Sequence, residues 1–233
     1  NGKFALKLAT ETDTLVGVRL LTKDDHVMLV TERAMAVRFH PAEQKEKVDK
    51  DTGETTVSET VRVQGRISQG VAGINLNQGD RVVGMIVAAA HDTTILTITR
   101  NGMAKRSRLG TAVRVPDLDR DGNERFDDDG QMKMMTDGYR STNPGAKGVR
   151  TMKLDEQFND ELISVRRIPD PGDNLFVLTK KGMMIRLAVN QTKETSGKST
   201  KGTRIMELRN KKKTSFEDEI IFTARLPAEL VEQ

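Results

Sequence analysis

Cysteine and tryptophan are absent from the 233 residues of the chain, and aromatic side chains make up only 3% of it. Without cysteine there is no disulfide framework, no thiolate metal site and no cysteine nucleophile. With so few aromatic residues, a core must be built from Val, Ile, Leu and Met, which suits small repeated sheets. No apolar run approaches the ~20 residues of a membrane span and no signal peptide is evident, so we expect no membrane partner.

Charge is distributed unevenly along the chain. The net charge is +4, but residues 115–138 alone carry −5, which leaves +9 on the rest. Bases gather in residues 99–114 and 139–153, which contain no acid, and in residues 193–213, which hold eight bases and two acids. A phosphate-binding surface needs such stripes, although an ordinary solvated basic surface has the same composition.

A short element of the form Gly-x-x-x-(apolar)-x-Leu occurs four times, and this repeat is the strongest signal in the sequence. Its glycines are Gly2, Gly70, Gly148 and Gly202. A short apolar segment follows each copy, and we expect a strand at residues 15–18, 82–85, 162–165 and 220–222.

A β-hairpin is predicted three times, over residues 27–38, 95–106 and 175–186. The distance from the element glycine to a hairpin threonine is 29, 29 and 31 residues, and an arginine follows that threonine by 7 residues in each copy. Asn101-Gly102 is a strong signal for a type I′ turn, which needs positive φ at both central positions. Arg33-Ala34 departs from this pattern, because alanine resists positive φ.

These repeats predict an all-β fold of four-stranded antiparallel blades that share their cores by stacking. We expect one pinwheel part over residues 1–233, truncated at its N-terminus because the chain begins with Asn1. The expected units are residues 1–66, 67–143, 144–197 and a partial unit 198–233. Two polar insertions, near residues 43–60 and 115–138, are predicted to be surface loops or extended hairpins.

Residues 69–85 (QGVAGINLNQGDRVVGM), 99–106 (TRNGMAKR) and 146–149 (AKGV) resemble the blade signature of the C-terminal domain of the DNA gyrase A protein. The resemblance recurs blade by blade and covers nearly the whole chain apart from the two insertions. It implies a β-pinwheel, a propeller-like disc whose blades exchange strands with their neighbours. It also implies a basic outer rim that binds and wraps duplex DNA and so directs negative supercoiling.

The resemblance further implies the partners and cofactors of an ATP-dependent type II topoisomerase in the bacterial cytoplasm, associated with the nucleoid. The partners are double-stranded DNA, the gyrase B protein and a second gyrase A protein, while ATP and Mg²⁺ act through other domains, with no cofactor in this chain. The A-type protein of topoisomerase IV has a similar disc. A box of Gln-Arg-Arg-Gly-Gly-Lys-Gly character usually distinguishes gyrase, and no such box occurs here. A propeller scaffold that binds an acidic protein is a third interpretation.

DNA wrapping needs cations spaced along a curved edge rather than a base-reading helix. Arg38, Arg106 and Arg186 occupy equivalent hairpin positions and are predicted to point to one rim. The backbone N–H groups of the element glycines could approach phosphates closely. The further DNA-binding candidates are Arg66, Lys105, Arg108, Arg140, Lys147, Arg150, Lys193, Lys198, Lys201 and Arg204.

Other candidate sites are weaker. Residues 117–128 resemble a calcium loop, with candidate ligands Asp117, Asp119, Asp121 and Asp128, but position 8 is Glu124 and no amphipathic helix flanks the segment. We therefore favour a solvated acidic loop over a calcium site. Tyr139 is the only tyrosine, and its neighbourhood does not resemble that of a DNA-cleaving tyrosine, so no catalytic residue is predicted. Six methionines are predicted to fill the core: Met28, Met103, Met152, Met183, Met184 and Met206.

Overall fold

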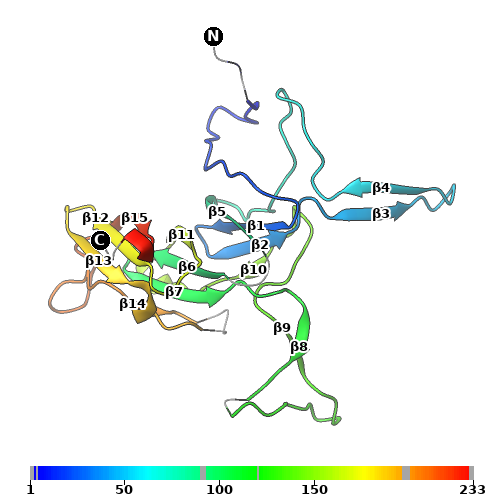
Figure 1. The fold of residues 1–233 in the computed structure, drawn as a ribbon. Helices are drawn as coiled ribbons and strands as arrows, with labels where there is room; N and C mark the ends of the chain where they lie inside the picture. The colour runs from blue at the N-terminus through cyan, green and yellow to red at the C-terminus, as the bar shows by residue number, and fades with distance from the viewer. Residues whose placement is uncertain (1–2, 4, 90–92, 120, 196–199, 231–233) are drawn as a thin grey trace.

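The computed structural model describes residues 3, 5–89, 93–119, 121–195 and 200–230, and this part of the chain is almost entirely β-structure. Three antiparallel sheets lie side by side as blades, and two narrow two-stranded arms project from them (Figure 1). The remaining regular structure consists of three single-turn 3₁₀ helices, η1 (Glu156–Phe158), η2 (Val189–Gln191) and η3 (Ala228–Leu230). None of the helices in the described residues is long and apolar enough to cross a membrane.

Each blade is built around one of the predicted hairpins. The first blade has the strand order β10 (Val149–Arg150), β2 (Met35–Phe39), β1 (Asp25–Thr31), β5 (Val82–Ala89). The second has the order β14 (Thr203–Arg204), β7 (Met103–Arg108), β6 (Thr94–Thr99), β11 (Leu162–Ile168). The third has the order β13 (Met184–Ala188), β12 (Asn174–Thr179), β15 (Ile220–Leu226). All three predicted hairpins and the all-β fold class are therefore confirmed.

The hairpin turns share one construction. The threonine that ends the first strand accepts a hydrogen bond at Oγ1 from the backbone N–H four residues later, at 3.1 Å in the first hairpin, 3.2 Å in the second and 3.1 Å in the third. Gly102 and Gly182 take positive φ at the same turn position, and Ala34 takes it too, at φ 61°. An alanine there costs roughly 1–2 kcal/mol relative to an unstrained backbone.

The sheets are not contiguous stretches of sequence. The strand that follows each element pairs with the hairpin before it: β5 with β1, β11 with β6, and β15 with β12. The outermost strand comes from still further along the chain, because β10 joins the first blade and β14 joins the second. The blades thus exchange strands, and the pairings cross the boundaries of the expected sequence units.

This pairing rule explains one wrong prediction. Residues 15–18 were expected to form a strand, but the structure shows no regular structure there. Their equivalents each pair with a preceding hairpin, and the described chain contains no hairpin before residue 15. The segment therefore has no edge with which to form a ladder.

The element glycines are explained by the same rule. A Cβ placed on Gly148 would lie 2.2 Å from the Ala36 carbonyl oxygen, and one on Gly202 would lie 2.4 Å from the Ala104 oxygen. Gly70 has the same positive φ, but nothing lies within 4 Å of its Cβ position. The glycine allows the outermost strand to approach the neighbouring hairpin closely, and only the copies with a hairpin beside them use this property.

The cores lie between the blades. Alternate residues of β6 face opposite ways: Ile95 belongs to the core shared with the first blade, and Leu96 to the core shared with the third. Met28 and Met152 are buried as predicted. Met183 and Met184 are 59% and 65% exposed, so their assignment to the core is wrong. They lie at the start of the second strand of the third blade, which has no described sheet beyond it.

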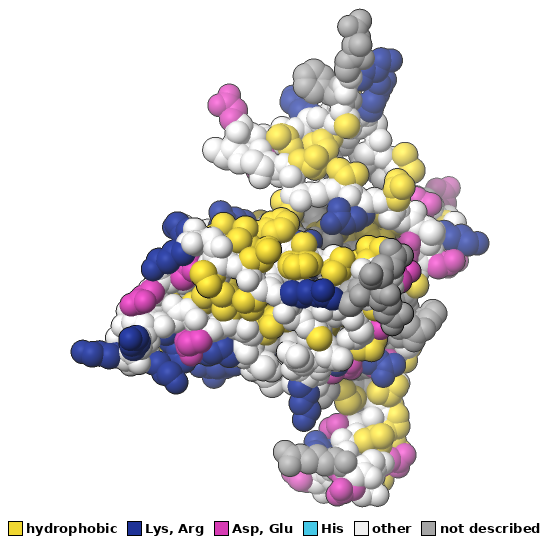
Figure 2. Space-filling view, turned by 60° about the vertical axis from the view of Figure 1, so that its left-hand side comes forward, with side chains coloured by type: hydrophobic (Ala, Val, Ile, Leu, Met, Phe, Trp, Pro, Cys, Tyr) yellow, Lys and Arg dark blue, Asp and Glu magenta, His cyan; other side chains and the backbone are white. Residues whose placement is uncertain are grey.

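Both insertions form projecting arms, as the prediction of extended hairpins allowed. One arm pairs β3 (Gln44–Val48) with β4 (Thr55–Glu59), and the other pairs β8 (Arg114–Pro116) with β9 (Met134–Thr136). Figure 2 shows hydrophobic side chains gathered in the middle of one face of the blades, while Asp and Glu side chains gather on the lower arm, which contains β8 and β9.

Candidate nucleic-acid interface

The outermost strands of the first and second blades carry matching sets of cations. In the first blade, Thr142 N–H donates to the Arg38 carbonyl oxygen at 2.7 Å, and β10 pairs with β2 further along. In the second blade, Thr195 N–H donates to the Arg106 carbonyl oxygen at 2.9 Å, and β14 pairs with β7. Residues 140–150 of the first blade and the described residues 193–195 and 200–204 of the second therefore run along equivalent edges, and Figure 1 shows β10 and β14 on the same side of the blades.

Six exposed predicted residues lie on these two segments, which we call the outer-edge cations. They are Arg140, Lys147 and Arg150 on the first blade, and Lys193, Lys201 and Arg204 on the second. Among the described residues, no carboxylate lies within ion-pair distance of the three first-blade cations. On the second blade, Lys201 Nζ lies 3.3 Å from Asp155 and Arg204 Nη1 lies 3.7 Å from Glu207. Glu207 and Asp155 partly neutralise this edge.

The hairpin arginines do not form a rim, and this part of the prediction is wrong for Arg38. Its side chain is 1% exposed, and Nη1 donates to the carbonyl oxygens of Leu109 at 2.9 Å, Gly110 at 2.8 Å and Tyr139 at 2.9 Å. Burial lowers its pKa to about 10, opposed by the charge of Asp137. Arg38 is thus a structural clamp between the first blade and the base of the β8–β9 arm.

Arg106 and Arg186 occupy the equivalent hairpin positions, and they differ from Arg38 in exposure because their surroundings differ. Arg106 is half-buried, whereas Arg186 is exposed and donates through Nε to Asn174 Oδ1 at 3.1 Å. The predicted DNA contact of Lys105 is also wrong, because its side chain is 1% exposed and Nζ donates to the Thr151 carbonyl oxygen at 2.5 Å. Of these three side chains, Lys105 is the one that bonds to a segment of the neighbouring blade, since Thr151 directly follows β10.

The remaining candidates are dispersed. Arg66 is exposed in a segment without regular structure, and Arg108 Nε lies 3.7 Å from Asp137 at the base of the arm. Lys198 lies outside the described residues.

A repeated aspartate, which was not among the predicted residues, fixes the hairpin turns. Asp80, Asp160 and Asp218 each accept at Oδ1 a backbone N–H from a hairpin turn, donated by Arg33, Asn101 and Lys181 at 3.1 Å in all three cases. Each also accepts the N–H of the next residue, at 2.9, 3.0 and 2.9 Å. The sequence contains a pattern from which this role could have been predicted, because an aspartate lies two residues before each of these three inner strands.

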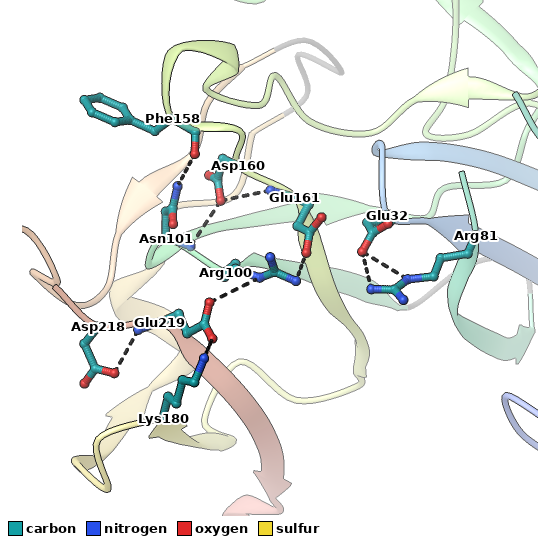
Figure 3. Close-up of polar contacts among 10 residues, drawn as sticks. All are labelled: Glu32, Arg81, Arg100, Asn101, Phe158, Asp160, Glu161, Lys180, Asp218 and Glu219. Atoms are coloured by element: carbon teal, nitrogen blue, oxygen red, sulfur yellow. Dashed lines mark hydrogen bonds and ion pairs between the residues drawn. The ribbon is translucent and has the colours of Figure 1, made fainter. Parts of the chain in front are cut away.

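Beside each aspartate lies an ion pair that joins the turn to the inner strand. Figure 3 draws the three pairs together with Asp160 and Asp218. Glu32 pairs with Arg81 at 2.6 Å, Arg100 pairs with Glu161, and Lys180 pairs with Glu219 at 2.8 Å. In the first pair the acidic residue lies on the turn, whereas in the other two pairs the turn carries the basic residue. Arg100 also reaches Glu219 at 3.7 Å and so links the second blade to the third. These groups stabilise the disc and are not free to bind a ligand.

The acidic segment does not have the arrangement of a calcium loop. Asp119 Oδ1 accepts the backbone N–H groups of Asp121 and Asn123, at 2.8 and 2.9 Å, and Asp117 lies 3.7 Å from Arg125. Among the described residues, no three His, Asp or Glu side chains come together as metal ligands. The candidate ligands Asp117, Asp119, Asp121 and Asp128 are spread along a projecting arm, and this geometry does not support the calcium prediction.

Tyr139 lies in the core, not on a DNA-facing surface. Its side chain is 2% exposed, and burial raises its pKa to about 12. Its backbone N–H donates to the Leu109 carbonyl oxygen at 2.9 Å. A tyrosine so placed is a neutral structural group rather than a nucleophile.

Comparison with known proteins agrees with this architecture. The chain is 29% identical over 209 residues to the DNA gyrase A protein of Staphylococcus epidermidis and 28% identical to that of Staphylococcus aureus. In both cases the match covers 89% of this chain and 18% of the relative, so the chain spans about a fifth of the curated relatives it matches.

Two solved structures share the fold. The C-terminal domain of DNA topoisomerase IV superposes with a TM-score of 0.67 at 17% identity, covering 97% of this chain and 53% of that one. The DNA gyrase A C-terminal domain superposes with a TM-score of 0.51 at 16% identity, covering 89% and 67%. The family described as "DNA gyrase C-terminal domain, beta-propeller" matches residues 56–89, 93–113, 136–169 and 173–214. These segments make up more than half of the sequence, and the chain therefore belongs to the DNA gyrase C-terminal domain family.

Proposed function

We propose that this chain is the DNA-binding and DNA-wrapping part of a gyrase A protein. The observation that carries the proposal is the pair of matching outer-edge cation sets on adjacent blades. Strand exchange places them at equivalent positions, so a duplex that follows the edge meets one set after the other. No base-reading helix is present among the described residues, so binding depends on phosphate charge and on how easily the DNA bends.

The magnitudes are consistent with bending. Bending a site of 20–30 bp by 40–90° costs on the order of 1–6 kcal/mol. If the six outer-edge cations each contact a phosphate, log K falls against log salt with a slope of about −5. The associated release of counterions offsets the bending cost at low salt and is largely lost at high salt.

The wider assembly is part of the same proposal and rests on the gyrase relationship. The chain acts in an assembly of two gyrase A and two gyrase B proteins, which works as an ATP-dependent type II topoisomerase in the bacterial cytoplasm. ATP and Mg²⁺ act at other domains, and this part directs the sign of supercoiling rather than cleaving DNA.

A mobility-shift titration at several salt concentrations tests the DNA contact. The double variant Arg150→Gln with Arg204→Gln is expected to bind duplex DNA more weakly for every sequence and to reduce the salt slope by about 2. Arg125→Gln, on the acidic arm, is the control and is expected to bind as the wild type does. Indifference of the wild type to duplex DNA would refute the proposal and favour a scaffold for an acidic protein.

The choice between gyrase and topoisomerase IV needs the complete enzyme. Reconstituted with ATP and its B-type partner, the full-length protein that contains this chain is expected to supercoil relaxed plasmid negatively. Decatenation without supercoiling would instead identify a topoisomerase IV protein.

A further inference from the structure

The innermost strands of the three blades surround a cleft far from the outer edge. Residues of β5, β11 and β15 line it together with residues 16–19, and its volume is about 220 Å³. Its polar lining includes the Ser164 and Thr223 hydroxyls, which are hydrogen-bonded to each other at 2.8 Å. These segments are the four sequence-equivalent stretches that follow the element repeats, so the cleft lies where they converge.

The cleft is lined by two arginines and by no acidic residue. Arg19 and Arg166 both line it, and neither forms an ion pair within the part of the chain that the structure describes. Arg166 is half-buried, with Nη2 donating to the Thr223 carbonyl oxygen at 2.5 Å and Nε to Thr223 Oγ1 at 3.3 Å. Arg19 is exposed, with Nη1 donating to the Val18 carbonyl oxygen at 2.8 Å.

The two guanidinium groups are close enough to repel each other. Burial lowers the pKa of Arg166, and the charge of Arg19 lowers it further. Two like charges at one cleft, one of them half-buried, have an unfavourable interaction that an anion between them would reverse. Guanidinium groups bind the oxygens of phosphate and carboxylate in a bidentate geometry, which makes them suited to such an anion.

We propose that this cleft binds a small phosphate-bearing anion between Arg19 and Arg166. Its volume is below the ~300–1,000 Å³ of pockets for drug-sized ligands, so the occupant is inorganic phosphate, pyrophosphate or a compact phosphorylated molecule. The cleft is lined by the innermost strands, whereas the outer-edge cations follow β10 and β14. The anion site is therefore separate from the proposed DNA surface.

Isothermal titration calorimetry with sodium phosphate, and separately with pyrophosphate, tests this proposal at constant ionic strength in chloride. We expect saturable binding to the wild type. Arg19→Gln is expected to bind roughly tenfold more weakly, because it removes one charge and its hydrogen bonds from an exposed position. Arg33→Gln changes an exposed arginine that does not line the cleft and is expected to leave the affinity unchanged.

A second variant distinguishes loss of phosphate binding from loss of the fold. Arg166→Lys keeps the charge but loses the planar guanidinium that Thr223 orients at the cleft, and it is expected to weaken phosphate binding several-fold while circular dichroism stays that of the wild type. Absence of saturable heat in the wild type, or equal affinities of the wild type and Arg19→Gln, would overturn the proposal. Displacement of phosphate by a short duplex would overturn it too, because the cleft would then belong to the DNA surface.

Discussion

The element glycines offer a sharp test of the strand exchange, because three of them have nearly the same backbone angle in different surroundings. Gly70, Gly148 and Gly202 have φ of 80°, 80° and 78°. Replacing each by alanine therefore adds the same left-handed penalty, roughly 1–2 kcal/mol, and the same gain of up to about 1 kcal/mol from a less flexible unfolded chain. What differs is the neighbour that the new methyl group meets.

In Gly148→Ala the new Cβ would lie 2.2 Å from the backbone carbonyl oxygen of Ala36, and in Gly202→Ala 2.4 Å from that of Ala104. A backbone atom cannot rotate away, so the strand must shift, at a cost of about 1–3 kcal/mol beyond the shared terms. In Gly70→Ala nothing lies within 4 Å. We expect Gly70→Ala to lower the free energy of unfolding by about 0–2 kcal/mol, and each of the other two to lower it by about 1–3 kcal/mol more.

Urea unfolding followed by circular dichroism measures these differences directly. In thermal unfolding, each kcal/mol corresponds to about 2–4 °C for a chain of this size. Equal losses in Gly70→Ala and Gly148→Ala would refute the reasoning, because the contact with the neighbouring hairpin would then contribute nothing.

Three further predictions concern buried or ion-paired groups that hold the hairpins in place. Arg38→Met is expected to lower the free energy of unfolding by about 3 kcal/mol in urea, whereas Arg186→Met, at the exposed equivalent position, stays within about 0.5 kcal/mol. Glu32→Arg and Arg81→Glu are each expected to cost less than about 1 kcal/mol, and the double exchange to restore stability, since the pair is partly exposed; a double-mutant cycle without coupling would contradict this. Burial raises the pKa of Asp160 to about 6, so its contribution to stability is full below about pH 4 and is lost as the pH rises to 6. Asp160→Asn is expected to lack this loss, and parallel pH profiles of both proteins would refute it.

The hairpins and inner strands could be predicted because the chain repeats them at nearly constant spacing. Asn101-Gly102 specifies its turn locally, and the short, mainly apolar run Ile-Leu-Thr-Ile at residues 95–98 before that turn indicates a buried strand. Local signals of this kind survive in any tertiary context that keeps the hairpin.

The buried cations could not be predicted in the same way. Alternation divides a strand into two faces, but in a stacked blade both faces meet a neighbour, so a charged residue is no guarantee of solvent. Arg38 Nη1 and Lys105 Nζ donate to carbonyl oxygens of distant segments, and no local pattern indicates those segments. The partner of each exchanged strand could not be derived from the local pattern either, since β10 pairs with a hairpin more than 100 residues earlier in the chain.

That long-distance pairing has a mechanical consequence. The segments that carry the outer-edge cations belong, by sequence, to the stretch that continues into the next inner strand: residues 140–150 lead directly to β11, and residues 200–204 lead on to β15. Tension applied to one edge by a bent polymer is thus passed along the covalent chain to the innermost strand of the adjoining sheet. Because β10 and β14 each pair with an earlier hairpin, separating the outer strand of the first or second blade also pulls on the chain that forms the next sheet.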